Sequence, residues 1–190
     1  FSAGVPVLDF PYDYSIANGR AGMADIVEAY VSEEICQKMS HVMKENAMTE
    51  YMLTLAAFMI LLGRYSRQDE VILGSVAAGR THLATTDMLG MFVNTLTLTG
   101  NPASERKVEH FWEEVKDTCM DVFENQEYPF EELVQNLGIQ RDNSSNPLFD
   151  IMYVFQNNDT TEVELDGVVA KTVEYANKNA KFNITFTVFK

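Results

Sequence analysis

The segment from Glu50 to Leu62 constrains the fold more than any other part of the sequence, because it is apolar on nearly all sides of a helix. Thr49 precedes it as a helix-capping residue, and Gly63 follows it as the expected end. A helix without a polar face is stable only where other elements cover it. Soon afterwards, Val71-Ile72-Leu73 and small residues up to Ala78 form a run typical of a strand buried on both faces. Together these segments predict a layered α/β domain.

Further segments supply the remaining elements of such a domain. Phe92–Thr99 alternates as a strand does, with Asn94 as the one polar residue on its apolar face. The other expected elements are a strand around Asp25–Tyr30, a helix from Ser32 with Ile35, Met39, Val42 and Met43 facing inward, helices at Glu105–Glu124 and Phe130–Leu137, strands at Leu148–Phe155 and Phe182–Val188, and a hairpin at Val163–Ala170 that turns at Asp166-Gly167. Long helices and non-alternating strands predict an α/β fold with a two-layer mixed sheet and helices.

Charge and cysteine content exclude several classes of function. The formal net charge of −14 disfavours nucleic acid and anionic membranes as partners, since both bind basic surfaces. The longest apolar stretch, Tyr51 to Leu62, is shorter than the about 20 helical residues that span a bilayer. We expect no targeting segment at Phe1. Cys36 and Cys119 each lie on an apolar helical stripe, which predicts buried free thiols and a cytoplasmic setting.

Three short motifs carry the functional information. Gly90–Thr95 reads G-M-F-V-N-T, Asn125–Glu131 reads N-Q-E-Y-P-F-E, and Arg141–Leu148 reads R-D-N-S-S-N-P-L. In this order and at this spacing they resemble the C-terminal half of a nonribosomal peptide synthetase condensation domain. The likeness covers residues 5–190, and Pro6–Pro11 is similar to the linker that joins the two halves. The resemblance implies one lobe of the chloramphenicol acetyltransferase-like (CoA-dependent acyltransferase) fold.

The same resemblance implies a division of the chain and a set of partners. Residues 1–22 would be the inter-lobe linker, and residues 23–190 a C-terminal subdomain truncated at its C-terminal end. Its partners would be the N-terminal condensation subdomain, peptidyl carrier domains that carry phosphopantetheine, and an adjacent adenylation domain, with no cofactor bound directly by this chain. Such domains form amide bonds between carrier-bound aminoacyl or peptidyl thioesters.

The family's catalytic histidine motif, H-H-x-x-x-D-G, does not occur in this sequence. We therefore expect the chain to be inactive by itself and assign it no catalytic residue. His41, His82 and His110 have no partners at a recognisable triad spacing. The sequence also holds no cluster of metal ligands and no phosphate-binding glycine loop. The acidic runs Glu113-Glu114 and Glu131-Glu132 are expected to be solvated helix faces.

Arg80 is the strongest candidate for a supporting role at the active site. It follows a buried strand, where its guanidinium could form a fork to a carboxylate. The resemblance implies that this carboxylate is the aspartate of the H-H-x-x-x-D-G motif, and the alternative is a solvated loop arginine. Other candidates for the channel or its motifs are Gly90, Phe92, Asn94, Thr95, Tyr128, Arg141 and Asn146. For Asn94, a hydrogen-bonded core amide and a substrate contact both remain open.

Two positions depart from the family's pattern, and two other functions stay open. Ser145 stands where a second arginine is usual, and Glu127 stands where an aspartate is usual. One alternative function is a stand-alone, non-catalytic lobe that binds carrier domains or another protein. A second alternative is an acyltransferase that uses coenzyme A, which would also need the missing histidine half.

Overall fold

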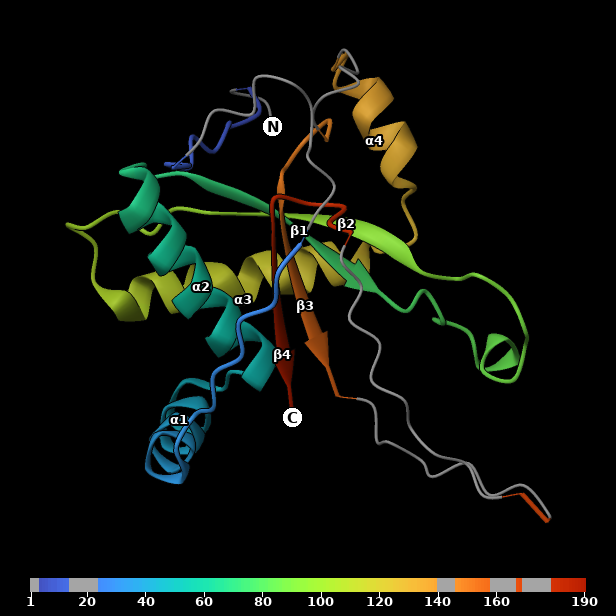
Figure 1. Cartoon of the computed structure of the whole chain (residues 1–190), viewed down its shortest axis with the longest axis horizontal. Coiled ribbons are helices and arrows are strands. Elements are labelled where there is room, and N and C mark those ends of the chain that lie inside the picture. Colours follow the sequence, from blue (N-terminus) through green and yellow to red (C-terminus); the bar gives the residue numbers. More distant parts are fainter. Residues whose placement is uncertain (1–3, 14–23, 140–145, 158–166, 169–178) are drawn as a thin grey trace.

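The protein is built on one mixed four-stranded sheet. The computed structural model describes residues 4–13, 24–139, 146–157, 167–168 and 179–190. Its strands are β1 (Val71–Ala77), β2 (Asn94–Gly100), β3 (Ile151–Gln156) and β4 (Ile184–Phe189), in the spatial order β2-β1-β3-β4. β1 is antiparallel to β2 and parallel to β3, and β4 is parallel to β3. The predicted α/β class with a mixed sheet is therefore confirmed (Figure 1).

Helices α2 (Glu50–Ser66) and α3 (Val108–Glu124) pack against the sheet, while α1 (Glu33–Asn46) lies at the periphery and α4 (Phe130–Asn136) near the start of β3 (Figure 1). The predicted end of α2 at Gly63 is wrong. The helix continues to Ser66 and ends where Arg67 adopts a left-handed conformation, with φ of 55°. Gly63 instead allows a close approach, because a Cβ there would lie 2.8 Å from Cγ of Pro102.

The main core lies between α2, α3 and the sheet. Its fully buried apolar residues include Leu55, Leu62, Val71, Leu73, Leu98, Val115, Cys119 and Ile151. Burying each large aliphatic side chain stabilises the fold by about 1.5–3 kcal/mol. Two pairs of hydrogen-bonded hydroxyl groups also lie inside this core. The Tyr51 hydroxyl donates to Ser75 at 2.9 Å, and the hydroxyls of Thr54 and Tyr153 are 2.7 Å apart.

The region before α2 differs from the prediction. Residues Asp25–Tyr30 form no strand and are exposed, with Val27 at 95% of its full accessibility. β-prone side chains form a strand only beside a partner strand, and the described residues provide none here. Ser32 caps α1 as predicted, since its hydroxyl accepts from the Ile35 N–H at 3.4 Å.

The inward face predicted for α1 is only partly present. No residue of this helix is buried: Ile35 is exposed, and Met39, Val42 and Met43 are half-buried. Cys36 is exposed, so its predicted burial is wrong, whereas Cys119 is buried as predicted. Both cysteines are free thiols. An apolar stripe in the sequence does not tell how much of a helix its neighbours cover.

The segment expected to be a linker packs along the end of α2. The side chain of Gln68 bridges it, accepting from the Asp9 N–H at 2.7 Å and donating to the Val7 carbonyl at 2.8 Å. The ring of Phe10 stacks on Tyr65 at a centroid distance of 6.1 Å. Of the predicted hairpin at 163–170, only Gly167 and Val168 lie within the described residues.

In the described part of the chain, no helix alone has the length and apolar character needed to cross a membrane. α1 and α2 pass that test only as a pair, and the pair is bent by 105°.

Candidate functional site

The first candidate region is the end of the sheet where β1 leads into β2. Ala77, the last residue of β1, pairs with Asn94, the first residue of β2, and the loop between them carries the short 3-10 helix η1 (Leu83–Thr85) (Figure 1). The two ends of this loop meet closely at Gly79. Its φ is +66°, and a Cβ there would lie 1.8 Å from the carbonyl oxygen of Phe92. A side chain is therefore excluded at this position for both conformational and steric reasons.

Arg80 follows directly and is held in place by two contacts. Its guanidinium carbon lies 4.4 Å from the centroid of the Phe92 ring. One of its terminal nitrogens donates to the carbonyl of Thr85 in η1. Within the described residues, no carboxylate lies within ion-pair distance of this exposed side chain. The guanidinium is thus oriented by its own loop and retains N–H groups for an acceptor from outside.

Asn94 connects the first motif to the second. Its side-chain nitrogen donates to the backbone carbonyls of Gln126 and Tyr128, each at 2.8 Å, and its oxygen accepts from the Thr95 N–H at 2.9 Å. The amide is therefore fully engaged in holding the turn between α3 and α4 against the start of β2. This arrangement positions backbone, and it leaves no amide hydrogen for a substrate.

A second link joins this turn to the arginine loop. The Thr81 hydroxyl donates to the carboxylate of Glu127, 46 residues away in sequence. Arg80, Thr81, Phe92, Asn94 and Glu127 thus form one connected group, which we call the motif cluster. Sequence reasoning identified the importance of Arg80, Phe92 and Asn94 but gave no role to Thr81. The pairing of Thr81 with Glu127 depends on the path of the loop, and no spacing rule predicts it.

The other motif residues lie around or away from this cluster. Gly90 is exposed, and a Cβ there would lie 3.3 Å from the Phe92 ring. Thr95 is half-buried on β2, and the Tyr128 hydroxyl accepts from the side-chain nitrogen of Asn136 at 2.5 Å. Arg141 falls outside the described residues.

Asn146 lies toward the opposite end of the sheet, because it precedes β3 and β3 runs parallel to β1. Its N–H donates to the Asp150 carboxylate at 3.3 Å, and its side-chain nitrogen is buried without a partner among the described residues. The structure therefore brings the first two motifs together and leaves this residue of the third apart.

The three histidines occupy exposed positions. His41 Nε2 lies 3.2 Å from a carboxylate oxygen of Glu45, one turn along α1. The carbonyl of His82 accepts from the N–H and the hydroxyl of Thr85, at 2.9 and 2.6 Å, and so helps to shape η1. His110 lies on α3 beside a polar hollow. No His, Cys, Asp or Glu cluster in the described ranges could hold a metal ion.

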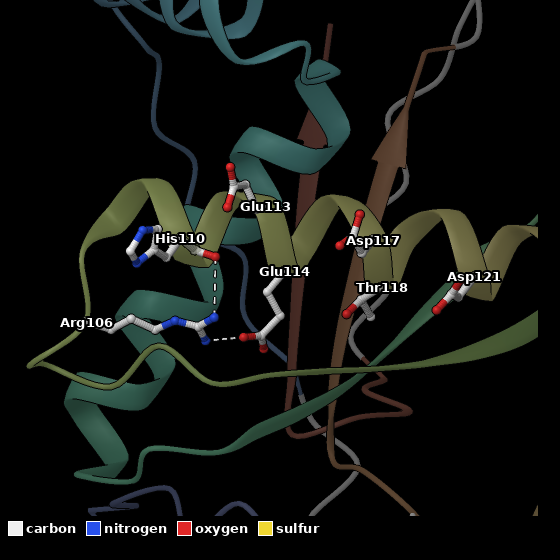
Figure 2. A pocket seen from close by; sticks show the side chains of 7 residues that line it. All are labelled: Arg106, His110, Glu113, Glu114, Asp117, Thr118 and Asp121. Atoms are coloured by element: carbon white, nitrogen blue, oxygen red, sulfur yellow. Dashed lines mark hydrogen bonds and ion pairs between the residues drawn. The ribbon is translucent and has the colours of Figure 1, made fainter.

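The polar hollow is the second candidate region (Figure 2). It has a volume of about 450 Å³ and is lined by Arg106, His110, Glu113, Glu114, Asp117, Thr118 and Asp121. Of the glutamates expected to be solvated, Glu113, Glu131 and Glu132 are exposed as predicted, whereas Glu114 is half-buried, with its side chain 28% exposed. It pairs with Arg106 and accepts from the Asn101 N–H at 2.8 Å, which fixes the strand-to-helix connection. The hollow is an acidic surface around a structural ion pair.

Comparison with known proteins gives a consistent result over the whole chain. The family described as condensation domain matches residues 1–190. Bacitracin synthase 1 of Bacillus licheniformis is 40% identical over 187 residues, which are 98% of this chain and 4% of that synthetase. The chain thus spans a small fraction of the relative it matches.

Two solved structures show the same fold. The X-domain from teicoplanin biosynthesis matches with a TM-score of 0.73 and 15% identity, over 80% of this chain and 34% of that one. A four-domain nonribosomal peptide synthetase bound to AMP and glycine matches with a TM-score of 0.66 and 24% identity, over 70% of this chain and 10% of that one. The partial coverage of the X-domain fits a subdomain rather than two lobes.

Proposed function

Because this chain belongs to the condensation-domain family of nonribosomal peptide synthetases, we propose that it supplies one lobe of an enzyme that forms amide bonds between carrier-bound thioesters. In that reaction the amine nitrogen of the acceptor attacks the thioester carbon of the donor. The carbon–sulfur bond breaks, and the proton leaving the amine ends on the carrier thiol. The lobe contributes one wall of the space in which the two carrier arms meet, and holding the reactants together is the larger part of its task.

The observation that carries this proposal is the motif cluster at the end of β1 and β2. Arg80 is exposed, and its contacts with Phe92 and Thr85 orient it. It has no carboxylate partner among the described residues, which suits a residue that pairs with another lobe. We assign it to the aspartate of an H-H-x-x-x-D-G segment on the N-terminal subdomain. A planar guanidinium binds a carboxylate through two parallel N–H groups, which fixes both the distance and the angle between the lobes.

The chain by itself is then inactive, because the catalytic histidine comes from the other subdomain. Residues 1–22 are the linker between the two lobes. Its contacts with Gln68 and Tyr65 support a defined path for the linker along the end of α2. Carrier domains bearing phosphopantetheine and an adenylation domain are the remaining partners.

The test replaces the matching 187 residues of bacitracin synthase 1 with this chain and measures amide formation between carrier-bound substrates. We expect the hybrid to be active and this chain alone to give no product. Arg80→Ala should lower the rate of the hybrid about 10- to 100-fold, the range for losing a charge-assisted hydrogen-bonded pair. Arg106→Ala removes the ion pair with Glu114 on α3 and serves as the matched control, with a change below about 2-fold. An Arg80→Ala hybrid as fast as the unmodified hybrid would remove the assignment.

A binding lobe is the second candidate, and one comparison favours it. The X-domain from teicoplanin biosynthesis has also been solved in complex with OxyB, and that structure matches this chain with a TM-score of 0.72. A molecule of this fold therefore serves as a platform for another protein. If the hybrid is inactive while the chain alone binds isolated carrier domains in calorimetry, this function replaces the first.

A further inference from the structure

We propose that Phe92 and Glu127 are positioning residues that hold Arg80 in a single orientation before its partner arrives. The proposal rests on the function proposed above, in which Arg80 meets a carboxylate of a second lobe. It adds that the geometry of Arg80 is prepared within this chain alone, by one aromatic ring and one anchored loop.

The guanidinium carbon of Arg80 lies over the ring of Phe92. The distance of 4.4 Å from the guanidinium carbon to the ring centroid is well inside the about 6 Å at which a cation and an aromatic face attract each other. This contact with the ring uses none of the guanidinium's hydrogen-bonding capacity, so N–H groups stay available for a carboxylate. The carbonyl of Thr85 takes one terminal nitrogen and sets the rotation of the group about its axis.

Phe92 is itself held where the arginine needs it. The residue is half-buried, its carbonyl lies against Gly79, and its ring lies beside Gly90. Two residues later Asn94 fastens the strand to the turn after α3. Phe92, the residue that contacts Arg80, is therefore fixed relative to β2 and the sheet.

Glu127 fixes the loop on the other side of Arg80. Its carboxylate accepts from the hydroxyl of Thr81, the residue that follows the arginine. Because Asn94 binds the carbonyls of Gln126 and Tyr128 on either side of Glu127, this acceptor is anchored to β2 as well. The loop is thus held on both sides of Arg80. Gly79 lies close against the Phe92 carbonyl, and Thr81 is hydrogen-bonded to Glu127.

The benefit of this arrangement lies in the entropy of binding. A free arginine side chain samples many rotamers and loses that freedom when it pairs. A side chain already held in the bound geometry has lost it during folding, so the pairing step is more favourable. Phe92 and Glu127 touch no substrate in this account and act only through Arg80.

The first experiment uses the 190-residue chain alone and observes Arg80 by NMR. In the unmodified chain, ring current from Phe92 should shift the Arg80 side-chain protons upfield. Phe92→Leu should abolish the shift, whereas Phe92→Trp should keep it. Thr81→Val should broaden the Arg80 signals, and Thr81→Ser, which keeps the hydroxyl, should not. Equal Arg80 signals in the unmodified chain and Phe92→Leu would overturn the proposal.

The second experiment asks whether Phe92 acts through Arg80 in the hybrid synthetase. Phe92→Leu should lower the rate of amide formation about 2- to 5-fold, the range for a cation–π contact at an exposed site. In an Arg80→Ala background the same change should have no further effect, because the group it positions is gone. An equal loss in both backgrounds would mean that Phe92 only packs the loop, and the proposal would fail.

The two readouts separate this proposal from the proposed function. Suppose that Arg80 shows the ring-current shift and loses it in Phe92→Leu, but the hybrid synthetase is inactive. The orientation of Arg80 by Phe92 would then be supported, and the amide-forming role would be rejected. If the isolated chain shows no ring-current shift but the hybrid is active, the amide-forming role would be supported and the orientation of Arg80 by Phe92 rejected. Should Phe92→Leu fail to fold, as judged by its amide spectrum, the comparison of Thr81→Val with Thr81→Ser decides.

Discussion

The interior beneath α2 and α3 and the motif cluster at the end of β1 and β2 are stabilised by different means. The interior consists of apolar side chains with almost no exposure, and its hydroxyl groups pair with each other. The motif cluster exposes Arg80, Thr81 and Glu127, and it is held by a few directed contacts from Arg80, Thr81 and Asn94. Around it the loop presents apolar side chains to solvent, such as Met91 at 91% of its full accessibility.

This difference separates stability from recognition. Many small contacts in the interior add up to the free energy of unfolding, and no single one determines what the chain can bind. At the motif cluster each contact determines where one group points. Changes in the interior should therefore affect the whole fold, and changes at the cluster should affect local order and function.

Alkaline pH tests the interior most severely and should unfold the whole chain. Burial raises the pKa of Cys119 to about 12 and raises the pKa values of Tyr51 and Tyr153 above their ordinary value of 10.0. The unfolded chain ionises these groups first, so unfolding releases protons. The contribution of these groups to the free energy of unfolding is therefore fully present below about pH 9, and it is lost as pH rises toward the raised pKa values. Denaturation curves by circular dichroism should show this loss.

Absorbance at 295 nm supplies the check on that titration. Tyr51 and Tyr153 should ionise only as structure is lost. Ionisation of all eight tyrosines with a native circular dichroism spectrum would contradict the prediction. Tyr51→Phe removes one linked group and should flatten the dependence of stability on pH.

The two thiols offer the next largest contrast. Cys36 is exposed and Cys119 is fully buried. In the Cys36→Ser variant, the remaining thiol should react with an aromatic disulfide reagent at least about 10³-fold more slowly than Cys36 does in Cys119→Ser, because it reacts only after opening of a fold worth about 5 kcal/mol. Comparable rates in the two variants would show that the interior opens readily.

Two leucines compare the regions directly. Leu73→Ala on β1 should lower the free energy of unfolding by about 2–5 kcal/mol, because it leaves a cavity in the core. Leu89→Ala on the exposed loop should change it by less than about 0.5 kcal/mol. Urea titration measures both. A large loss from Leu89→Ala would mean that the loop packs within this chain after all.

The same contrast explains how far the sequence could predict the structure. The helix from Glu50 and the strand at Val71 follow from apolar patterns that depend only on neighbours in sequence. The exposed Cys36 and the missing strand at Asp25–Tyr30 could not be foreseen, because exposure depends on which elements lie nearby. Within the site, Asn94 stood out as a polar residue on an apolar face. Its acceptors, and the pairing of Thr81 with Glu127, follow from tertiary geometry alone.

A pair of glycines tests the close approach under Arg80. Gly79 and Gly138 both have φ of +66°, so alanine costs each about 1–2 kcal/mol of backbone strain. At Gly79 the added Cβ would meet the Phe92 carbonyl oxygen, whereas at Gly138 it would meet no atom of the described residues within 4 Å. Gly79→Ala should therefore cost about 1–3 kcal/mol more than Gly138→Ala. Equal losses of stability in thermal unfolding would show that the loop moves aside without penalty.

A modest effect on stability is expected at Asn94, and it tests the comparison most sharply. Asn94→Ala removes donors to the Gln126 and Tyr128 carbonyls and should cost about 1–2 kcal/mol. Asn136→Ala removes one exposed hydrogen bond to the Tyr128 hydroxyl and should cost less than about 0.5 kcal/mol.

Hydrogen exchange distinguishes a local from a global change in these two variants. In Asn94→Ala the Tyr128 N–H, which donates to the Asn125 carbonyl at 3.0 Å, should exchange faster. The amides of Leu73 and Leu98, paired across β1 and β2, should keep their protection apart from the small global loss. If their protection fell as much as that of Tyr128, Asn94 would be part of the interior's cooperative unit. The motif cluster would then be as rigid as the core, and Arg80 would owe its orientation to the whole fold rather than to its loop.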